Sequence, residues 1–227
     1  LELGEQGAPN AQLGAQGMYA GKLTSSGRFL HSLVLEDGQY WGFYATNGPT
    51  GVMPTSFLQG QGTSNSGAFS APDVKDYGPT PASSAGVSAS YSPLVSLNGS
   101  VTVGSSVIPF TSTGMAEANY KYNTPARLSD VQGSQRVNGS LGLHTMQVAA
   151  DGTFGATTAF CNYSGKMTPR ASGKNVFDVS WTFGAGTCPL SGQTGTGVAF
   201  SFLPVAGVAR HMVIAVTNSA RTTGTIA

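Results

Sequence analysis

The sequence predicts an all-β protein made of two similar antiparallel β-barrel or curled-sandwich domains that arose by internal duplication. Three observations lead to this prediction. Apolar residues alternate with a period of two, turn-forming residues recur about every ten residues, and the two halves of the chain resemble each other. Gly accounts for 32 of 227 residues and charged residues for only 9%, which argues against a coiled coil or a helix bundle.

The first half opens with residues 1–16, which are rich in Gly, Gln and Ala and which we expect to form a flexible lead. A first β-barrel-like domain then spans residues 17–116, and its expected strands are short and bounded by Gly, Asn, Ser or Pro. These strands are 18–24, 29–35, 40–45, 53–62, 67–73, 86–93, 99–104 and 107–111.

The strongest hairpin signal is Asp37-Gly38, which lies between two runs of alternating apolar residues. An Asp-Gly pair in this setting predicts a two-residue type I′ turn, because that turn needs positive φ at both central positions. In the run after the turn, Trp41 and Phe43 share one face of the strand. We expect this face to fill the barrel interior.

A linker is expected at residues 117–123, followed by a second β-barrel-like domain at 124–227. Thr124-Pro125 predicts a short helical turn at its start, with Thr as the N-cap and Pro at the first helical position. The strands expected in this domain are 134–138, 143–150, 153–160, 163–168, 176–183, 196–203, 212–217 and 224–227.

Two pairs of segments carry the internal repeat. Residues 11–17 resemble 126–133, and residues 31–38 resemble 144–152, so the matched positions lie about half the chain apart. In each half, a short Leu-containing segment is followed by an Asp-Gly hairpin. Chance similarity between two Gly-rich β sequences is the alternative explanation.

Cys161 and Cys188 are the two cysteines of the chain, and their spacing is unlike that of zinc or thioredoxin motifs. A single pair in a small β-rich chain predicts a disulfide formed in an oxidising compartment. Closing this loop would stabilise the second domain by roughly 3–4 kcal/mol. Two unrelated buried thiols are the alternative.

Composition and motifs argue against several functional classes. The net charge is +1 and the basic residues are scattered, so we expect no nucleic-acid partner. No apolar run has the length of a transmembrane helix. His31, His144 and His211 lack metal-ligand spacing, and nucleophile-elbow and phosphate-loop motifs are absent, so we expect no metal, no cofactor and no catalytic residues. A Ser/His/acid site assembled from distant residues remains open as an alternative.

The aromatic residues give the candidate binding surface. Tyr40 and Tyr44 share the strand face opposite to the expected core, and Tyr120 and Tyr122 lie at the expected domain boundary. Tyrosines in such positions contact solvent, a ligand, a partner or a neighbouring domain. We therefore expect these four side chains either to bind a partner or to pack between the domains.

The chain resembles a group of Gram-negative envelope lipoproteins with small β-barrels. The residues that carry the resemblance are the Gly-Met-Tyr-Ala-Gly segment at 17–21, the two Asp-Gly hairpins and the cysteine pair. The first of these is also similar to the barrels of transferrin-binding and complement-regulator-binding surface lipoproteins. In the second half, the corresponding segment at 133–137 lacks the aromatic residue. The resemblance implies export and attachment to the outer membrane through a lipid-bearing cysteine that this chain does not contain.

These observations predict a non-catalytic envelope lipoprotein that contacts a host or envelope macromolecule, as a surface antigen or adhesion protein does. A carrier of a small apolar ligand in a barrel interior is the second hypothesis. A hydrolase with a scattered Ser/His/acid site is the third.

Overall fold

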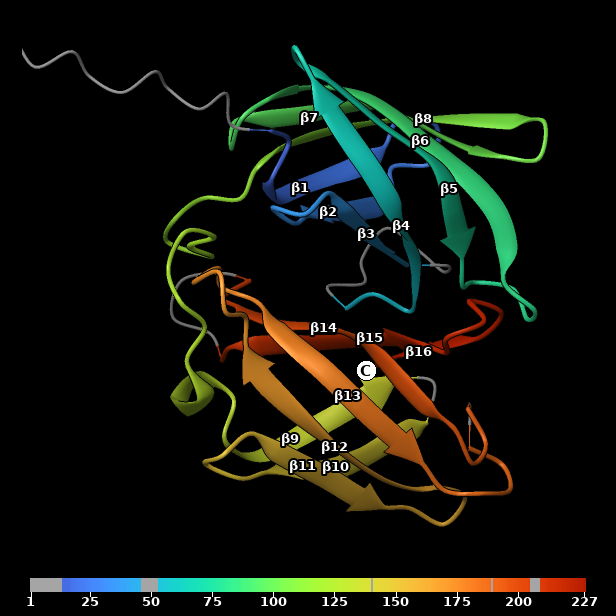
Figure 1. The fold of residues 1–227 in the computed structure, drawn as a ribbon, viewed down its shortest axis with the longest axis vertical. Helices are drawn as coiled ribbons and strands as arrows, with labels where there is room; N and C mark the ends of the chain where they lie inside the picture. Colours follow the sequence, from blue (N-terminus) through green and yellow to red (C-terminus); the bar gives the residue numbers. More distant parts are fainter. Residues whose placement is uncertain (1–13, 46–52, 140, 189, 205–208) are drawn as a thin grey trace, which may run out of the picture.

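The computed structural model describes residues 14–45, 53–139, 141–188, 190–204 and 209–227. The fold is all-β, as the sequence predicts, and consists of two antiparallel sheets whose strands follow one another in sequence order. The first sheet closes into a barrel, and the second curls into an open half-barrel that lies below it in Figure 1. The two similar domains therefore differ mainly in closure.

The closed barrel is a meander of short strands, each of which overlaps one of the expected ranges. Its strands are β1 (Gly17–Leu23), β2 (Phe29–Val34), β3 (Gln39–Tyr44), β4 (Ser56–Asn65), β5 (Ala68–Asp76), β6 (Ser83–Ser92), β7 (Ser96–Val103) and β8 (Ser106–Gly114). Strand β1 pairs with β8 from Tyr19↔Gly114 to Leu23↔Phe110. This pairing closes the sheet and removes the two edges that an open meander would expose.

The second sheet repeats this order but stays open. A 3₁₀ turn, η1 (Leu128–Asp130), precedes its strands β9 (Gly133–Gly139), β10 (Gly142–Val148), β11 (Thr153–Thr157), β12 (Asn162–Pro169), β13 (Phe177–Phe183), β14 (Thr194–Phe202), β15 (His211–Thr217) and β16 (Gly224–Ile226). In the described part of the chain, β9 pairs only with β10 and β16 only with β15.

The two Asp-Gly hairpins occupy equivalent places, between the second and third strands of each sheet. The amide of Gly38 donates to the Leu35 carbonyl, and the amide of Gly152 donates to the Ala149 carbonyl, at 3.0 Å in both turns. The Asp37 and Asp151 carboxylates each accept the amide two residues further on, also at 3.0 Å. This agreement in detailed hydrogen bonding supports the internal repeat.

The turn type predicted for Asp37-Gly38 is wrong, and Asp151-Gly152 forms the same turn as Asp37-Gly38. Gly38 and Gly152 have positive φ, whereas the aspartates before them do not. Each loop is therefore a three-residue turn whose glycine forms a bulge, rather than a two-residue type I′ turn. The carbonyls of both glycines also accept an amide from the strand beyond the hairpin, β4 or β12. A Cβ atom on either glycine would lie 2.1–2.3 Å from a backbone oxygen of that strand, so only glycine fits at this position.

The interior of the closed barrel is filled by side chains. Tyr19, Tyr40, Phe69 and Phe110 are fully buried there, together with small aliphatic residues from nearly every strand. The expectation that Tyr40 would face away from the core is therefore wrong. Its hydroxyl lies 3.2 Å from the Ser32 hydroxyl, and burial raises the pKa of Tyr40 to about 12.

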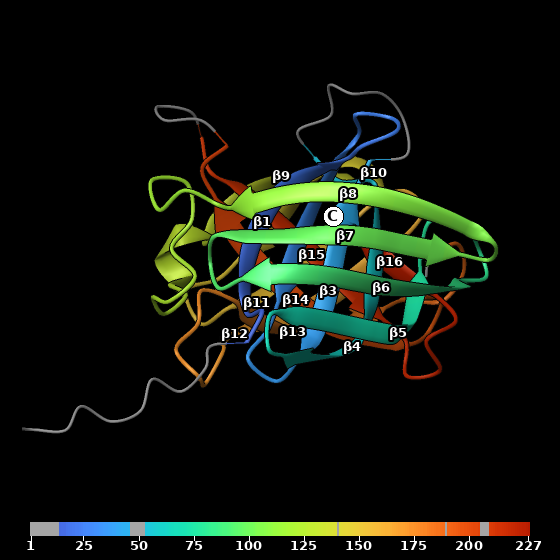
Figure 2. The same cartoon turned by 90° about the horizontal axis from the view of Figure 1, so that it is seen from above.

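Trp41 and Phe43 lie outside the barrel, in a third apolar cluster between the two sheets. The outer face of β2, β3 and β4 packs there against the outer face of β14 and β15, as Figures 1 and 2 show from two directions. The Phe43 and Phe200 ring centroids are 5.1 Å apart across this interface. The face of β3 that was expected to fill the barrel therefore lies outside it, and the opposite face lies inside. Both faces of this strand are buried and apolar, so the alternation of residues cannot show which face enters the barrel.

The segment between the sheets packs against the same cluster, and Tyr120 and Tyr122 are buried in it. The helical turn begins at Leu128 rather than at Thr124-Pro125, so that prediction is wrong. The Thr124 hydroxyl instead donates to the Lys121 carbonyl at 2.9 Å, which makes it part of a preceding turn. Within the described residues, no helix has the length and hydropathy needed to cross a membrane.

The second sheet has its own core, in which Trp181 and Phe177 are fully buried. Cys161 and Cys188 form a disulfide at the edge of this core, as predicted. The bond joins the β11–β12 connection to the segment between β13 and β14, so it fastens two loops at one end of the half-barrel.

Replacing Cys161 and Cys188 with alanine is expected to lower the free energy of unfolding by about 3–4 kcal/mol, because the unfolded chain regains the entropy of a closed loop. Urea unfolding followed by tryptophan fluorescence measures the difference. A reductant should destabilise the parent protein by a similar amount and leave the double variant unchanged. Equal stability of the parent protein and the variant without reductant would contradict the prediction.

Candidate functional site

The structure separates the four tyrosines proposed as a binding surface. Tyr40 is inside the barrel, and the half-buried Tyr44 donates its hydroxyl hydrogen bond to Asp76. Tyr120 and Tyr122 pack between the domains, which is the alternative that the sequence left open. These side chains therefore do not form one exposed patch.

The three histidines contact aromatic rings or backbone rather than the groups of a hydrolytic triad. The His144 Nε2 atom lies 2.7 Å from the Tyr163 hydroxyl. The ring centroid of Phe202 lies 6.2 Å from that of His31 and 5.8 Å from that of His211. Among the described residues, no His forms an ion pair with a carboxylate, and no group of three His, Cys, Asp or Glu side chains could hold a metal ion.

His31 gives the protein a pH-dependent stability. Burial lowers its pKa from 6.5 to about 4, since the surroundings do not compensate a positive charge. The unfolded chain therefore binds this proton between about pH 6.5 and pH 4 while the folded chain does not, so stability should fall as the pH is lowered through this window. The full contribution is about 3 kcal/mol.

Replacing His31 with phenylalanine should remove this contribution, because the new ring can pack beside Phe29 and Phe202 without titrating. As the pH is raised from 4 to 7, the free energy of unfolding of the parent should rise relative to that of the variant by about 3 kcal/mol. Parallel pH profiles for the two proteins would contradict the assignment to His31.

The candidate functional site is the opening between the two ends of the second sheet, β9 on one side and β15 with β16 on the other, which we call the seam. Among the described residues, strand β9 has a partner on one side only, whereas its counterpart β1 in the barrel pairs with both β2 and β8. On the other side of the seam, β16 has only three residues. A Cβ atom on Gly224 would lie 2.7 Å from the rings of Phe57 and Tyr77, so β16 packs closely against the first barrel.

A cavity of about 580 Å³ lies along this seam, between β9–β10 and β15. Its apolar floor includes Val137, Met146 and Ile214, which also belong to the core of the half-barrel. Ligand-binding cavities of proteins commonly have volumes of about 300–1,000 Å³, so the space suffices for side chains of a partner or for a small molecule.

The rim of the seam cavity is basic. Arg136 is exposed and forms no ion pair with the described residues, and Arg210 approaches Asp130 only at 4.0 Å. The Nδ1 atom of His211 is buried and has no hydrogen-bond partner in the described part of the chain. No carboxylate side chain lines the cavity among the described residues, so the rim favours a negatively charged group.

Sequence reasoning missed this site, because the expected strands that end the two halves, 107–111 and 224–227, are similar in length. Whether such a strand also pairs with the first strand of its sheet depends on contacts between segments distant in the chain. Comparisons with protein-family models, curated proteins and solved structures found no match to this chain.

Proposed function

We propose that this chain is a non-catalytic binding protein that contacts another macromolecule, and that an extended segment of a polypeptide partner binds along β9. The observation that carries the proposal is that the described part of the chain pairs with only one edge of β9, and that the other edge lies beside an apolar cavity. A free strand edge presents unpaired amides and carbonyls, which an added strand can satisfy.

The first barrel supports this proposal by showing how the meander closes. Strand β8 fills the position beside β1 that β16 leaves vacant beside β9. A partner segment at this position would pair with β9 and cover Val137, Met146 and Ile214. Since the same strand order is stable when closed, the added strand would need little rearrangement of the sheet.

The chemistry of the seam specifies the partner segment. Alternate side chains of a strand point to opposite faces, so one set would enter the apolar cavity and the other would face the rim. Arg136 and Arg210 at the rim favour acidic residues in that second set. The expected partner sequence therefore alternates apolar and acidic residues.

The barrel interior gives no comparable support to an apolar-ligand carrier, because Tyr19, Tyr40, Phe69 and Phe110 occupy it. Among the described cavities, none is lined by these four side chains. The seam cavity is where a small apolar molecule would compete with a partner segment.

Selection of short peptides from a random display library against the folded chain tests the proposal. We expect enrichment of extended sequences that alternate apolar and acidic residues, and added protection from hydrogen exchange for the β9 amides that do not bond to β10 when such a peptide binds. Arg136→Glu should weaken binding about tenfold through charge repulsion. Arg136→Lys should largely preserve binding.

Arg28→Glu is the matched control, because this exposed arginine lies between β1 and β2 of the other domain. If Arg28→Glu weakened peptide binding as much as Arg136→Glu does, the loss would reflect the change in net charge alone. That result would contradict peptide binding at the seam. Protection of a segment other than β9, or association of two copies through β9, would also overturn the proposal.

We also propose that the protein is exported to an oxidising compartment, with the resemblance to envelope lipoproteins supporting the outer membrane as its location. The Cys161–Cys188 disulfide supports export, because such bonds persist mainly outside the reducing cytosol. A thiol-reactive maleimide added to lysed producing cells should modify neither cysteine unless a reductant is present. Modification of both cysteines without reduction would contradict the assignment.

A further inference from the structure

The seam has a second strand edge, which belongs to β15. Strand β16 pairs with β15 as far as Ala215↔Ile226. One residue further, the amides of Ile214 and Ala227 each donate to the carbonyl of the other, at 2.8 and 2.9 Å. Within the described residues this is the last pair between the two strands. The first residues of β15, 211–213, therefore lie beside the opening.

The backbone of Met212 points toward this opening. In an antiparallel strand the hydrogen-bonding groups alternate between the two sides, so residues two apart bond to the same side. Ile214 bonds to Ala227 on the seam side, and the register of β14 with β15 is continuous, so Met212 directs its amide and carbonyl to the seam side as well. On that side, Met212 forms no backbone hydrogen bond with any described residue.

The seam cavity reaches both edges. It is lined from each side, by Gln135 and Val137 of β9, Met212 and Ile214 of β15, and Ala227 directly after β16. Val137 and Ile214 belong to the core of the half-barrel, and Met212 packs against that core, so their side chains point inward. A strand in this cavity therefore lies between two edges, not beside one.

The first barrel shows the direction of a strand in this position. Strand β8 lies between β1 and β7 and is antiparallel to both. Strands β9 and β15 are the counterparts of β1 and β7, and β16 is antiparallel to β15. A segment that continues the line of β16 between β9 and β15 is therefore antiparallel to both. Its first residue lies beside Ala227, and the segment then runs toward Arg210.

The length and register of the segment follow from the strands around it. Strand β8 has nine residues and β16 has three, so about six residues would complete the last strand of the half-barrel. The second residue of the segment lies two positions beyond Ala227 and opposite Met212. Ala227 and Met212 both pack against the core, so this second residue also points into the cavity and should be apolar.

We propose that the partner is a segment of about six residues that binds antiparallel to both β9 and β15, in line with β16. Its second residue exchanges two hydrogen bonds with Met212, and the residues on either side of it bond to β9. This inference rests on the proposed function, which needs only the edge of β9.

N-methylation of the peptide backbone tests whether both edges are used. The probe is the tightest acetylated six-residue peptide from the display selection, made with one N-methyl group at each position in turn. We expect binding about tenfold weaker at each of the first three positions, because every methyl group removes an amide donor that faces one edge or the other. Weakening at every second position only would mean that β9 alone is paired. That result overturns this inference and leaves the proposed function standing.

Hydrogen exchange of the complex with the same peptide gives a second readout. The Met212 amide should gain protection, because the second peptide residue accepts from it. The Ile214 amide already donates to Ala227, so it is the internal control on the same strand and should change little. Protection of β9 amides without protection of Met212 would confine the peptide to one edge and overturn this inference alone.

A nitroxide label on the peptide tests the direction. Attached to the first residue, it should broaden the amide signal of Val216, which lies on β15 beyond the Ala227 end of the segment. Attached to the last residue, it should leave that signal sharp. The reverse pattern means a parallel segment and overturns this inference while β9 pairing stands. A selection that enriches no binding peptide overturns the proposed function and this inference together.

Discussion

Replacing Phe200 with alanine is expected to lower the free energy of unfolding by about 3–5 kcal/mol, the usual range for removing a buried aromatic ring. Phe200 is 1% exposed and lies at the centre of the apolar cluster between the domains. Its ring centroid is 5.1 Å from that of Phe43 in the barrel and 6.1 Å from that of Tyr120 in the linker. The variant therefore loses contacts with both domains at once.

The same variant should also separate the unfolding of the two domains. The shared cluster makes the stability of each domain depend on the other, so we expect the parent protein to unfold in one transition. Urea unfolding followed by fluorescence and by circular dichroism should give coincident curves for the parent and two distinguishable steps for Phe200→Ala. Loss of less than 1 kcal/mol would show that the interface contributes little.

Phe160→Ala is the control for this experiment. Phe160 is 75% exposed, so its removal creates no cavity, and we expect a change within about 0.5 kcal/mol. A comparable loss in both variants would point to a general effect of deleting a ring rather than to the domain interface.

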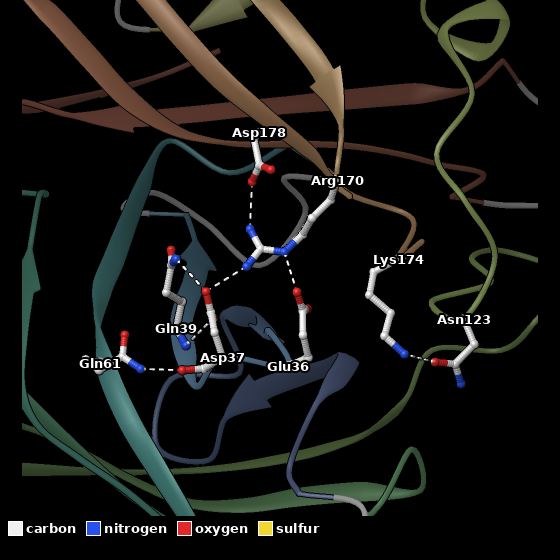
Figure 3. A network of polar contacts seen from close by, with 8 residues as sticks. All are labelled: Glu36, Asp37, Gln39, Gln61, Asn123, Arg170, Lys174 and Asp178. Atoms are coloured by element: carbon white, nitrogen blue, oxygen red, sulfur yellow. Dashed lines mark hydrogen bonds and ion pairs between the residues drawn. The ribbon is translucent and has the colours of Figure 1, made fainter. Parts of the chain in front are cut away.

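Replacing Arg170 with alanine should destabilise the protein by about 2–3 kcal/mol, because three carboxylates lose their common cation. The Arg170 nitrogens lie 2.7 Å from Glu36, 2.7 Å from Asp37 and 2.6 Å from Asp178, and Figure 3 shows that the first two partners come from the other domain. The side chain is 12% exposed, but its partners are more exposed, so the loss stays below that of a fully buried pair.

The Arg170 effect should depend on pH. Burial opposes ionisation of Glu36, but hydrogen bonds from Arg170, its own backbone and Ser172 hold the pKa of Glu36 below its ordinary value of 4.5. A carboxyl group with a lowered pKa stabilises the folded state above that value and loses this contribution as the pH falls through the folded pKa. The difference between the parent and Arg170→Ala should therefore shrink below about pH 4.5.

Arg170→Lys is the matched variant, since it keeps the charge but carries its donors on one nitrogen, whereas Arg170 reaches its three carboxylates from three separate nitrogens. We expect its stability to lie between those of the parent and Arg170→Ala. A stability equal to that of Arg170→Ala would assign the effect to guanidinium geometry alone. A pH-independent difference between the parent and Arg170→Ala would contradict the role of Glu36.

The candidate seam could not be predicted from the sequence, because the expected strands that end the two halves, 107–111 and 224–227, are similar in length. The basic rim could not be foreseen, because Arg136 of β9 and Arg210, which directly precedes β15, are far apart in the sequence and line one cavity only in the folded sheet.

The sequence alone determined the strands, the repeated Asp-Gly hairpins and the disulfide, because alternation, turn chemistry and paired cysteines act over short distances or through composition. Only the tertiary structure decided which face of β3 enters the barrel. Tyr40 and Trp41 are both buried, one inside the barrel and one between the domains, and a strand covered on both sides gives no polar face to distinguish them. Closure of the first sheet and opening of the second were decided in the same way, because they depend on packing between segments distant in the chain.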